Sequence, residues 1–546
     1  MTAHFIGVDV GTGSARAGVF DENGTLLAVA KRPISIWHED GNFVEQSSED
    51  IWNAVSTSVK EVVAASGVDP ADVRGLGFDA TCSLVVVAAD GSPIAVGHSG
   101  DSNRNIIVWM DHRAAGEAEE INAGKHEVLR YVGGRISPEM ETPKLLWLKR
   151  NLPDSFAAAG HFFDLADYLT WRATGSLTRS TCTVTCKWTY LAHENRWDSD
   201  YFNKIGLGEL VAERFARIGT EIAQPGTPLA AGLTETAADE LGLPPGTAVG
   251  ASLIDAHAGG VGTLGAAAEG LTSDFGRRLA YVFGTSACSM ASSQEPVFVN
   301  GVWGPYFSAM IPGLWLNEGG QSAAGAAIDH LVAMHPASAS TAELAEAAGT
   351  SLVGWLDAEA SKMCGDLQDV MALAHRIHVV PEFLGNRSPN ADPDARAVIA
   401  GLNLDEGISD LVALYIAGLC GIGYGLKQLL VKLGEEGIPI DLVIASGGAA
   451  QSNLVRQFLA DTTNVRVAVV DNPEPVLLGS AMLAAVASGH RRNVAEAMET
   501  MSRISRVFEP AQGALKRVHD IRYGIFERLQ SVDREIRTEL RMGLPQ

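Results

Sequence analysis

The sequence is short of cysteine, of basic residues and of long apolar runs. Its six cysteines form no CxxC pair, and their spacings match no zinc-binding pattern. So few scattered cysteines in 546 residues are typical of reduced, buried thiols, and we therefore expect a cytoplasmic protein. No apolar run reaches about 18 residues, which predicts no membrane span. The first residues lack a basic stretch followed by an apolar one, so no secretory signal is expected.

Basic residues are outnumbered: 41 lysines and arginines stand against 65 aspartates and glutamates, and the formal net charge is −24. That charge disfavours nucleic acid and other polyanions as partners, and its simplest effect is solubility. A small anionic ligand is still compatible with it, because a phosphate site is local and needs only backbone N–H groups and one or two cations. At roughly 150 residues per domain, the length predicts two large domains or several small ones.

The opening segment has the pattern of three short strands joined by tight turns, at residues 5–10, 15–20 and 26–30. The first turn is rich in glycine, which lets backbone N–H groups approach an anion without a Cβ clash. Hydroxyls, an arginine fork and a strand-end aspartate suited to Mg²⁺ through water accompany it. The phosphate-binding candidates are Asp9, Gly11, Thr12, Gly13, Ser14 and Arg16, with Asp9 also the metal candidate. Taken alone, the segment is equally compatible with an ordinary hairpin turn.

A second strand–turn–strand segment repeats this pattern about a domain's length later. Residues 279–283 and 287–292 are expected strands, and the turn between them is Gly284-Thr285-Ser286. The first turn fits neither a Rossmann nor a Walker loop, since a strand follows it and no Gly-Lys-Ser/Thr comes after it. Two such turns, one from each domain, could clamp a triphosphate from both sides.

A glycine pair, Gly447-Gly448, ends a predicted strand at residues 441–446, and a helix is expected to begin near Asn453. Such a junction leaves a flat, open surface for a planar base. A helix entry that needs glycine only for packing has the same signature. We assign these residues and Gly325 to the nucleotide site.

Asp255 follows a predicted buried strand that lies between the two glycine-rich turns. Phosphoryl transfer to an alcohol needs a carboxylate that can accept the hydroxyl proton. Asp255 is the candidate for this role, although an aspartate that caps the next helix would look the same. The neighbouring His257 is interpreted as structural.

Several motifs in a fixed order indicate a family. The chain resembles the FGGY carbohydrate kinases, a branch of the actin/hexokinase superfamily, from about residue 5 to residue 490. The motifs that carry the resemblance are residues 7–16, 44–46 with Trp52, 109–113, 143–147, 254–257, 318–322, 386–389 and 446–449.

The resemblance implies an α/β fold with two ribonuclease-H-like domains, of the actin/hexokinase type, around a central cleft. We expect an N-terminal domain at residues 1–257, a nucleotide-binding domain at 258–490 and a helical C-terminal appendage at 491–546. It also implies ATP and Mg²⁺ as cofactors and a small sugar as substrate. A homodimer is expected because dimers are the commonest assembly.

Within the family the chain looks most like the ribulokinase group of pentulokinases. By that likeness, Lys187 on a strand, Glu318, Asp111 and, approximately, Thr81 and Cys82 contact the sugar together with Asp255. A surface lysine and one half of an ion pair are the alternatives for Lys187 and Glu318.

The expected substrate is D-ribulose, phosphorylated at its terminal C5 hydroxyl. The Arg-Glu pair of glycerol kinases does not follow Asp79, and Thr81-Cys82 stands where xylulokinases usually carry Met-His. A kinase for L-ribulose, ribitol or xylulose is the alternative within the class. A non-catalytic sugar or nucleotide sensor on the same scaffold is the alternative outside it.

Overall fold

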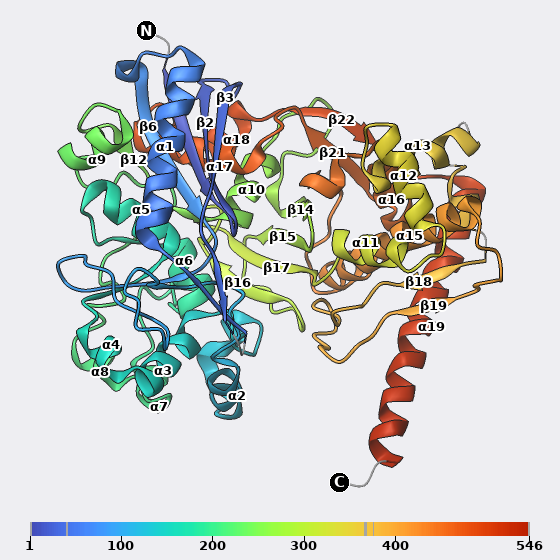
Figure 1. Cartoon of the computed structure of the whole chain (residues 1–546), viewed down its shortest axis with the longest axis horizontal. Helices are drawn as coiled ribbons and strands as arrows, with labels where there is room; N and C mark the ends of the chain where they lie inside the picture. Colours follow the sequence, from blue (N-terminus) through green and yellow to red (C-terminus); the bar gives the residue numbers. More distant parts are fainter. Residues whose placement is uncertain (1–2, 40–41, 365–368, 375, 544–546) are drawn as a thin grey trace.

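The computed structural model describes residues 3–39, 42–364, 369–374 and 376–543. Two α/β lobes lie side by side, the first mostly blue to green and the second mostly yellow to red in Figure 1. Each lobe is built around a mixed β-sheet whose apolar strand residues are buried. The predicted α/β class with two domains is therefore confirmed.

The first sheet has the strand order β12-β6-β1-β2-β3, and β13 also pairs with β6. The strands β1, β2 and β3 form the predicted antiparallel meander, whereas β6 joins β1 in parallel. The strands of this sheet are β1 His4–Val10, β2 Ser14–Asp21, β3 Leu26–Pro33, β6 Val73–Ala80, β12 Ala248–Val249 and β13 Leu253–Ile254.

The second sheet repeats the plan of the first and extends it. Its order is β16-β17-β15-β14-β20-β21-β22, in which the run from β17 to β21 matches β3-β2-β1-β6-β12. The strand β14 is antiparallel to β15 and parallel to β20, as β1 is to β2 and β6. The strands are β14 Arg278–Phe283, β15 Ala287–Ser293, β16 Trp303–Phe307, β17 Trp315–Gln321, β20 Leu442–Ser446, β21 Arg466–Val470 and β22 Ile504–Phe508. The predicted echo of the opening hairpin is thus a repeat of the whole sheet order.

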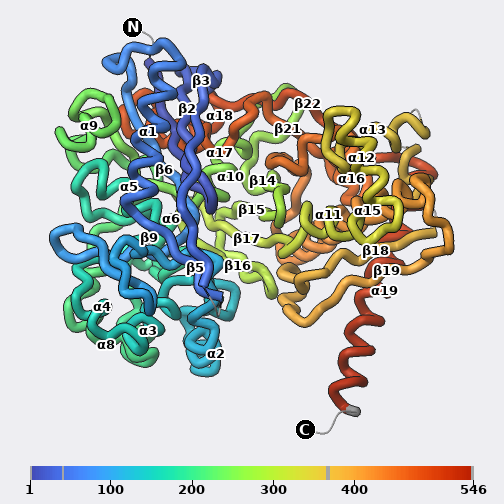
Figure 2. Tube along the Cα trace, in the orientation of Figure 1, coloured from blue at the N-terminus to red at the C-terminus, as the bar shows by residue number. Residues whose placement is uncertain are grey.

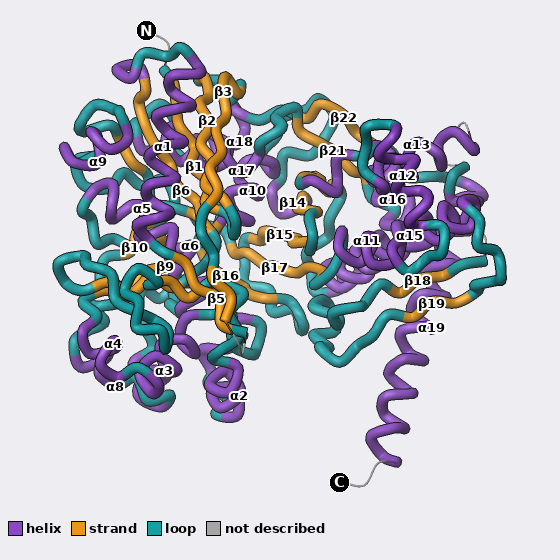
Figure 3. Tube along the Cα trace, viewed as in Figure 1, coloured by secondary structure: helices purple, strands orange, loops and turns teal. Residues whose placement is uncertain are grey.

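Helices pack against both sheets and fill the lower part of the first lobe (Figure 3). Those of the first lobe are α1 Ser48–Ser66, α2 Ala115–Ala123, α3 Glu141–Asn151, α4 Pro153–Ala158, α5 Leu165–Thr174, α6 Thr181–Trp188, α7 Ser199–Lys204, α8 Gly208–Ala212 and α9 Glu235–Leu241. Those of the second are α11 Gly325–Ala333, α12 Ser338–Ala347, α13 Leu352–Cys364, α14 Met371–Ala374, α15 Ile408–Glu435 and α16 Asn453–Thr463. A five-stranded sheet, β4-β5-β8-β7-β9, supports the lower part of the first lobe with strands β4 Trp37–Glu39, β5 Phe43–Gln46, β7 Leu84–Val87, β8 Ile106–Ile107 and β9 His161–Asp164.

Two helices join the lobes: α10 Asp255–Leu264 and α17 Pro475–Ala487. The helix α17 comes late in the chain, yet it packs on β1 and β6, and Figure 2 shows its red tube among the blue strands. A Cβ on Gly7 would lie 1.9 Å from the Leu477 carbonyl oxygen, so only glycine permits this approach. The helix α10 packs on both α17 and β14. The predicted boundary at residue 257 therefore falls inside a helix that both lobes share.

The segment predicted as an appendage, residues 491–546, is integrated into the fold over its first part, which corrects that prediction. Helix α18 Val494–Met501 packs on α10 and α17, and β22 pairs with β21 as the last strand of the second sheet. The first part of α19 Gly513–Gly543 packs on β18 His378–Val380 and on α16, and its final turns project from the second lobe in Figure 1.

Helix α15 is 28 residues long and apolar enough to cross a membrane by length and composition. Because 72% of its most apolar stretch is buried inside the second lobe, α15 has the character of a core helix.

Candidate active site

A cavity of about 390 Å³ between the lobes brings together most of the predicted site residues. Its wall combines the end of β1, both glycine-rich turns, the start of α10 and part of β17. The predicted residues in this wall are Asp9, Gly11, Thr12, Ser14, Arg16, Thr81, Cys82, Lys187, Asp255, Gly284, Thr285, Ser286 and Glu318.

The two turns face the same cavity and are closed in the same way. In the first turn, the Gly11 N–H donates to the Ser14 carbonyl at 3.0 Å, and in the second the Gly284 N–H donates to the Ser286 carbonyl at 2.9 Å. Arg16 forms an ion pair with Asp9 and another, at 2.8 Å, with Glu474 of the second lobe. Arg16 therefore places a cation in the cavity that both turns face, where phosphate oxygens would need one.

Three carboxyl groups meet at the carboxyl ends of parallel strands. Asp9 on β1 lies opposite Asp79 on β6, and Asp255 follows β13 at the same edge. Burial, and then the negative charge of Asp9, raises the pKa of Asp255 to about 6. The same two causes raise the pKa of Asp79 well above its ordinary value.

This carboxylate cluster suits a divalent cation. Ser480 Oγ donates to Asp79 Oδ2 at 2.5 Å, whereas the buried Asp79 Oδ1 has no hydrogen-bond partner among the described residues. Mg²⁺ prefers carboxylate oxygens and water as ligands, and neutralising three adjacent carboxylates would relieve their repulsion. The residues present therefore fit the metal that ATP carries.

The predicted nucleotide residues lie beyond the second turn. A cavity next to Gly284 and Thr285 is lined by Gly325, Gly448 and apolar or aromatic side chains of α11, α15 and α16. Gly447 and Gly448 also line a third cavity, which reaches back to Arg16.

Gly325 has a further contact with the second turn. Its N–H donates to the Gly284 carbonyl at 3.0 Å, and a Cβ at this position would lie 2.6 Å from that oxygen. Glycine is thus required where α11 begins.

Two of the predicted nucleotide residues are not in these walls. Asn453 is exposed, and its Oδ1 accepts a hydrogen bond from Arg456 Nη1 at 3.2 Å. Gly13 is exposed at the tip of the first turn, where its carbonyl accepts from the Ile34 N–H.

Glu318 stands at the centre of a charged network in the cavity wall. Arg387 Nη2 donates to its Oε1 at 3.1 Å, and His257 Nε2 lies 3.3 Å from its Oε2. Burial alone would raise the pKa of Glu318. The His257 hydrogen bond and the charges of Lys187, His257 and Arg387 instead hold this pKa at about 2. The carboxylate is therefore ionised and able to accept hydrogen bonds from sugar hydroxyls.

Lys187 reaches the same wall from α6, which is a helix and not the predicted strand. The Ser180 side chain accepts from the Cys182 N–H and caps this helix, which overrides the Thr- and Val-rich composition. The Lys187 ammonium lies 4.9 Å from the centre of the Trp303 ring, and Arg387 lies 4.2 Å from the same ring. Trp303 therefore spaces two cations around the end of the cavity where the sugar is predicted to bind, the predicted sugar end.

Asp111, predicted to contact sugar, lies outside the cavity wall. Its Oδ2 accepts from Arg113 Nη2 at 2.7 Å and from the Val44 N–H at 2.6 Å, and both charged side chains are fully buried. The segment 109–113, which contains Asp111, still contacts the site, because Trp109 Nε1 donates to Thr12 Oγ1 at 3.0 Å. Asp111 thus stabilises the scaffold that positions the first turn.

Substitution of Asp111 by asparagine is expected to destabilise the first lobe by about 3 kcal/mol, because it leaves the buried Arg113 charge with Glu45 as its remaining partner. Thermal and urea unfolding measure this loss, with exposed Glu119→Gln as the control. The KM for sugar of the folded protein should stay within about twofold. A large rise in KM without lost stability would restore Asp111 to the sugar site.

Sequence reasoning missed several cavity residues: Glu139, His257, Cys288, Trp303 and Arg387. Two of them stand inside motifs already recognised, since His257 follows Asp255 by two residues and Arg387 lies in the segment 386–389. Trp303 and Cys288 carried no local signal, because only the pairing of β15, β16 and β17 brings them to the cavity.

The FGGY family of carbohydrate kinases matches this chain in both domains. Residues 4–262 match the N-terminal domain and residues 279–488 the C-terminal domain. An FGGY carbohydrate kinase domain-containing protein of Homo sapiens is 45% identical over 97% of this chain and 97% of its own length. A D-ribulokinase of Saccharomyces cerevisiae is 42% identical over 89% of this chain and 72% of its own.

Solved structures agree on the fold. The xylulose kinase of Rhodospirillum rubrum, 22% identical, superposes with a TM-score of 0.79 over 98% of this chain and 99% of its own. The cavity between two lobes, the paired glycine-rich turns that face it and these matches lead to one assignment. The chain belongs to the FGGY family of carbohydrate kinases and is a sugar kinase that uses ATP as its phosphate donor.

Proposed function

We propose that this sugar kinase phosphorylates a ketopentose at its terminal C5 hydroxyl, and that D-ribulose is the preferred substrate. The observation that carries the proposal is the convergence of Lys187, Glu318 and Asp255 in one cavity that also receives both phosphate turns. The likeness to the yeast D-ribulokinase over most of the chain supports the choice of ketose.

In the proposed reaction, Asp255 accepts the proton of the C5 hydroxyl as the oxygen attacks the γ-phosphate. Lys187 and Glu318 hold other sugar hydroxyls by charge-assisted hydrogen bonds and so aim C5 at the phosphate. The backbone N–H groups of the two turns and Arg16 bind phosphate oxygens from opposite lobes. Closure of the lobes around α10 and α17 would exclude water from this cavity.

Asp9 and Asp79 are the residues that would hold Mg²⁺ in its hydrated form, beside Asp255, whose carboxylate stays free to accept the proton. The ion supplies charge neutralisation of the phosphates. For Mg²⁺ to bind at Asp9, the Arg16 side chain must leave Asp9 and contact phosphate oxygens instead. Glu474, its second ion-pair partner, can keep Arg16 in place during this change.

The substrate proposal is tested by comparing kcat/KM for D-ribulose, L-ribulose, xylulose and ribitol in a coupled ADP-release assay. D-Ribulose should have the highest kcat/KM. Each polar contact that a poorer substrate lacks should cost about 1–3 kcal/mol. A higher kcat/KM for any of the other three would replace D-ribulose. ADP release with none of them above the sugar-free rate would favour the sensor alternative.

The rate should also depend on the ionisation of Asp255. Since the pKa of Asp255 is raised to about 6 with Asp9, His257 and Lys187 facing it, the base is ionised above that pH and protonated below it. We expect kcat/KM to be flat above about pH 7 and to fall about tenfold per unit well below pH 6. Initial rates between pH 4.5 and 8.5 at saturating MgATP measure this, and a rate that rises on acidification would contradict it.

We also propose a cytoplasmic homodimer. All six cysteines are free thiols, as expected of a reducing compartment.

The homodimer rests on helix α19, which carries an exposed apolar stripe that suits pairing with a second copy. The stripe consists of Val518, Ile521, Val532, Ile536 and Leu540. The arginines of α19 alternate with Asp533, Glu535 and Glu539, so two antiparallel copies could match opposite charges. Light scattering of Ile536→Glu against wild type tests this, and an unchanged dimer mass or a monomeric wild type would contradict the proposal.

A further inference from the structure

Three soft metal ligands meet directly behind the predicted sugar end of the cavity. The Sγ atoms of Cys182 and Cys186 and a ring nitrogen of His257 all lie within 4.8 Å of one another, and all three residues are buried. The cysteine spacing in the sequence matches no zinc pattern, because the third residue comes from a segment about seventy residues away.

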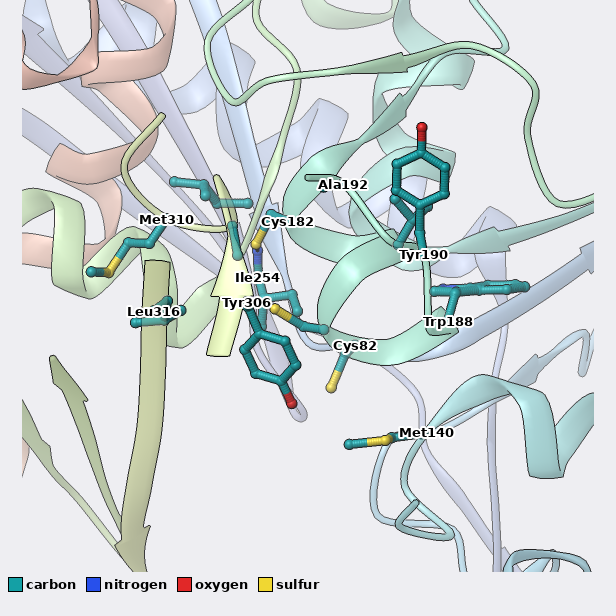
Figure 4. Close-up of a cluster of buried hydrophobic side chains, with 14 of the residues drawn as sticks. Cys82, Met140, Cys182, Trp188, Tyr190, Ala192, Ile254, Tyr306, Met310 and Leu316 are labelled. Atoms are coloured by element: carbon teal, nitrogen blue, oxygen red, sulfur yellow. Dashed lines mark hydrogen bonds between the residues drawn. The ribbon is translucent and has the colours of Figure 1, made fainter. Parts of the chain in front are cut away.

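Local structure explains why the three side chains converge. Cys182 and Cys186 stand one turn apart on α6, so their thiols share one face of the helix. His257 lies in the first turn of α10, and the backbone N–H of Ile254, just before that helix, is 3.4 Å from Cys182 Sγ. Figure 4 shows Cys182 beside Ile254 in this buried cluster.

The spacing is close to that of a tetrahedral zinc site. Zn–S bonds of about 2.3 Å and Zn–N bonds of about 2.0 Å place neighbouring ligand atoms roughly 3.3–3.8 Å apart. Cys182 Sγ and His257 Nδ1 are 3.0 Å apart. Entry of a metal therefore requires these two atoms to separate by only about half an ångström.

The other side of His257 has the environment that metal-bound histidines show. A histidine that ligates a metal through one ring nitrogen usually donates its other N–H to a carboxylate, which fixes the ring and its tautomer. His257 Nε2 lies 3.3 Å from Glu318 Oε2, and Arg387 holds the second oxygen of that carboxylate. With Nδ1 toward the thiols and Nε2 toward Glu318, His257 has both partners in place.

We propose that Cys182, Cys186 and His257 form a binding site for a thiophilic divalent cation of the Zn²⁺ class, with one coordination position left for an exogenous ligand. Thiolate and imidazole ligands favour such metals over Mg²⁺, which prefers oxygen. The site is distinct from the carboxylate cluster at Asp9, Asp79 and Asp255, so the two metals do not share a ligand.

The position of this site has a consequence that rests on the proposed function. Bound metal would move His257, which lies two residues after the proposed base, away from Cys182 and would displace the Glu318 carboxylate that its Nε2 faces. We expect sugar-dependent turnover to fall when the site is loaded.

The binding test uses the reduced, metal-free full-length protein and Zn²⁺ or Cd²⁺ alone. One equivalent should bind in competition with a chromophoric chelator, and Cd²⁺ should produce a thiolate charge-transfer absorption. Cys182→Ser and Cys186→Ser should each lose this equivalent, whereas Cys420→Ser, a buried cysteine of the second lobe, should keep it. Circular dichroism confirms folding of each variant. No binding by wild type, or binding that survives both cluster substitutions, overturns the site.

Turnover is measured separately, so that the site and the proposed function can fail independently. Zn²⁺ should inhibit sugar-dependent ADP release by wild type and by Cys420→Ser, and a chelator should reverse it. The fractional inhibition should be lost in Cys186→Ser, which separates this site from competition with Mg²⁺. Equal inhibition of Cys186→Ser would overturn the inhibitory role, while a protein that binds the metal but phosphorylates no ketopentose would overturn only the substrate.

Discussion

Replacing Asp255 by asparagine is expected to lower kcat by about 10²–10⁴-fold while the Kd for sugar changes little. Asparagine has nearly the same shape and can still accept the hydrogen bond from the Ala256 N–H, which is 2.7 Å from Asp255 Oδ1. It cannot accept a proton from the sugar hydroxyl. The loss should therefore fall on the chemical step, which single-turnover kinetics at pH 8 can measure directly.

The control for this prediction is Asp274→Asn, an exposed aspartate at the start of a short helical turn. It should turn over normally. Isothermal titration with D-ribulose checks that the Asp255 variant still binds sugar. Near-normal turnover by Asp255→Asn would remove Asp255 as the base, and lost sugar binding would reassign it to substrate positioning.

Replacing Glu318 by glutamine is expected to lower kcat/KM for the sugar by about 10²-fold or more. The substitution leaves the buried charges of Arg387, His257 and Lys187 without their shared carboxylate, and truncating one partner of such a network costs about 2–5 kcal/mol. Because the proposed reaction places Glu318 on sugar hydroxyls and not on the reacting oxygen, most of the change should appear in KM.

Two further measurements test whether the Glu318→Gln effect is specific to sugar binding. Thermal unfolding separates lost binding from lost folding, and exposed Glu343→Gln serves as the matched control. The KM for ATP should stay within a few-fold in both variants. A Glu318→Gln enzyme with unchanged KM for D-ribulose would show that the carboxylate only balances charge inside the protein.

The placement of the two glycine-rich turns and of Asp255 in one cavity could be predicted from sequence because their signals are local. Each is a strand end followed by a glycine-rich turn or an acidic residue, and the carboxyl ends of parallel strands meet at one sheet edge. The register of Asp9 with Asp79 and of β13 with β6 then brings them together without any further information.

The predicted sugar end of the cavity was harder to derive from the sequence because it depends on contacts between distant segments. The family likeness placed Lys187 on a strand, but the Ser180 cap starts a helix there. Arg387 and Trp303 reach Lys187 and Glu318 only through the folded second lobe. Asp111 matched a family motif, yet its oxygens are already used by Arg113 and the Val44 backbone.

In the C-terminal part, whole helices and strands were misplaced for the same reason, because their partners are distant in the sequence. Charged, helical composition predicted an appendage from residue 491, but β22 completes the second sheet by pairing with β21. Helix α17 covers the first sheet although more than 450 residues separate it from β1. Glycines such as Gly7 mark that contact in the sequence, but they do not say which helix will lie over them.

The most direct test of the account is to identify the product formed from D-ribulose and MgATP. Phosphorus and carbon NMR of the reaction mixture should show one phosphate ester per ADP released, with the phosphorus coupled to C5. Phosphate on another carbon would contradict the placement of Asp255 beside the terminal hydroxyl. ADP release without a sugar phosphate, or no ADP release at all, would contradict the assignment of D-ribulose.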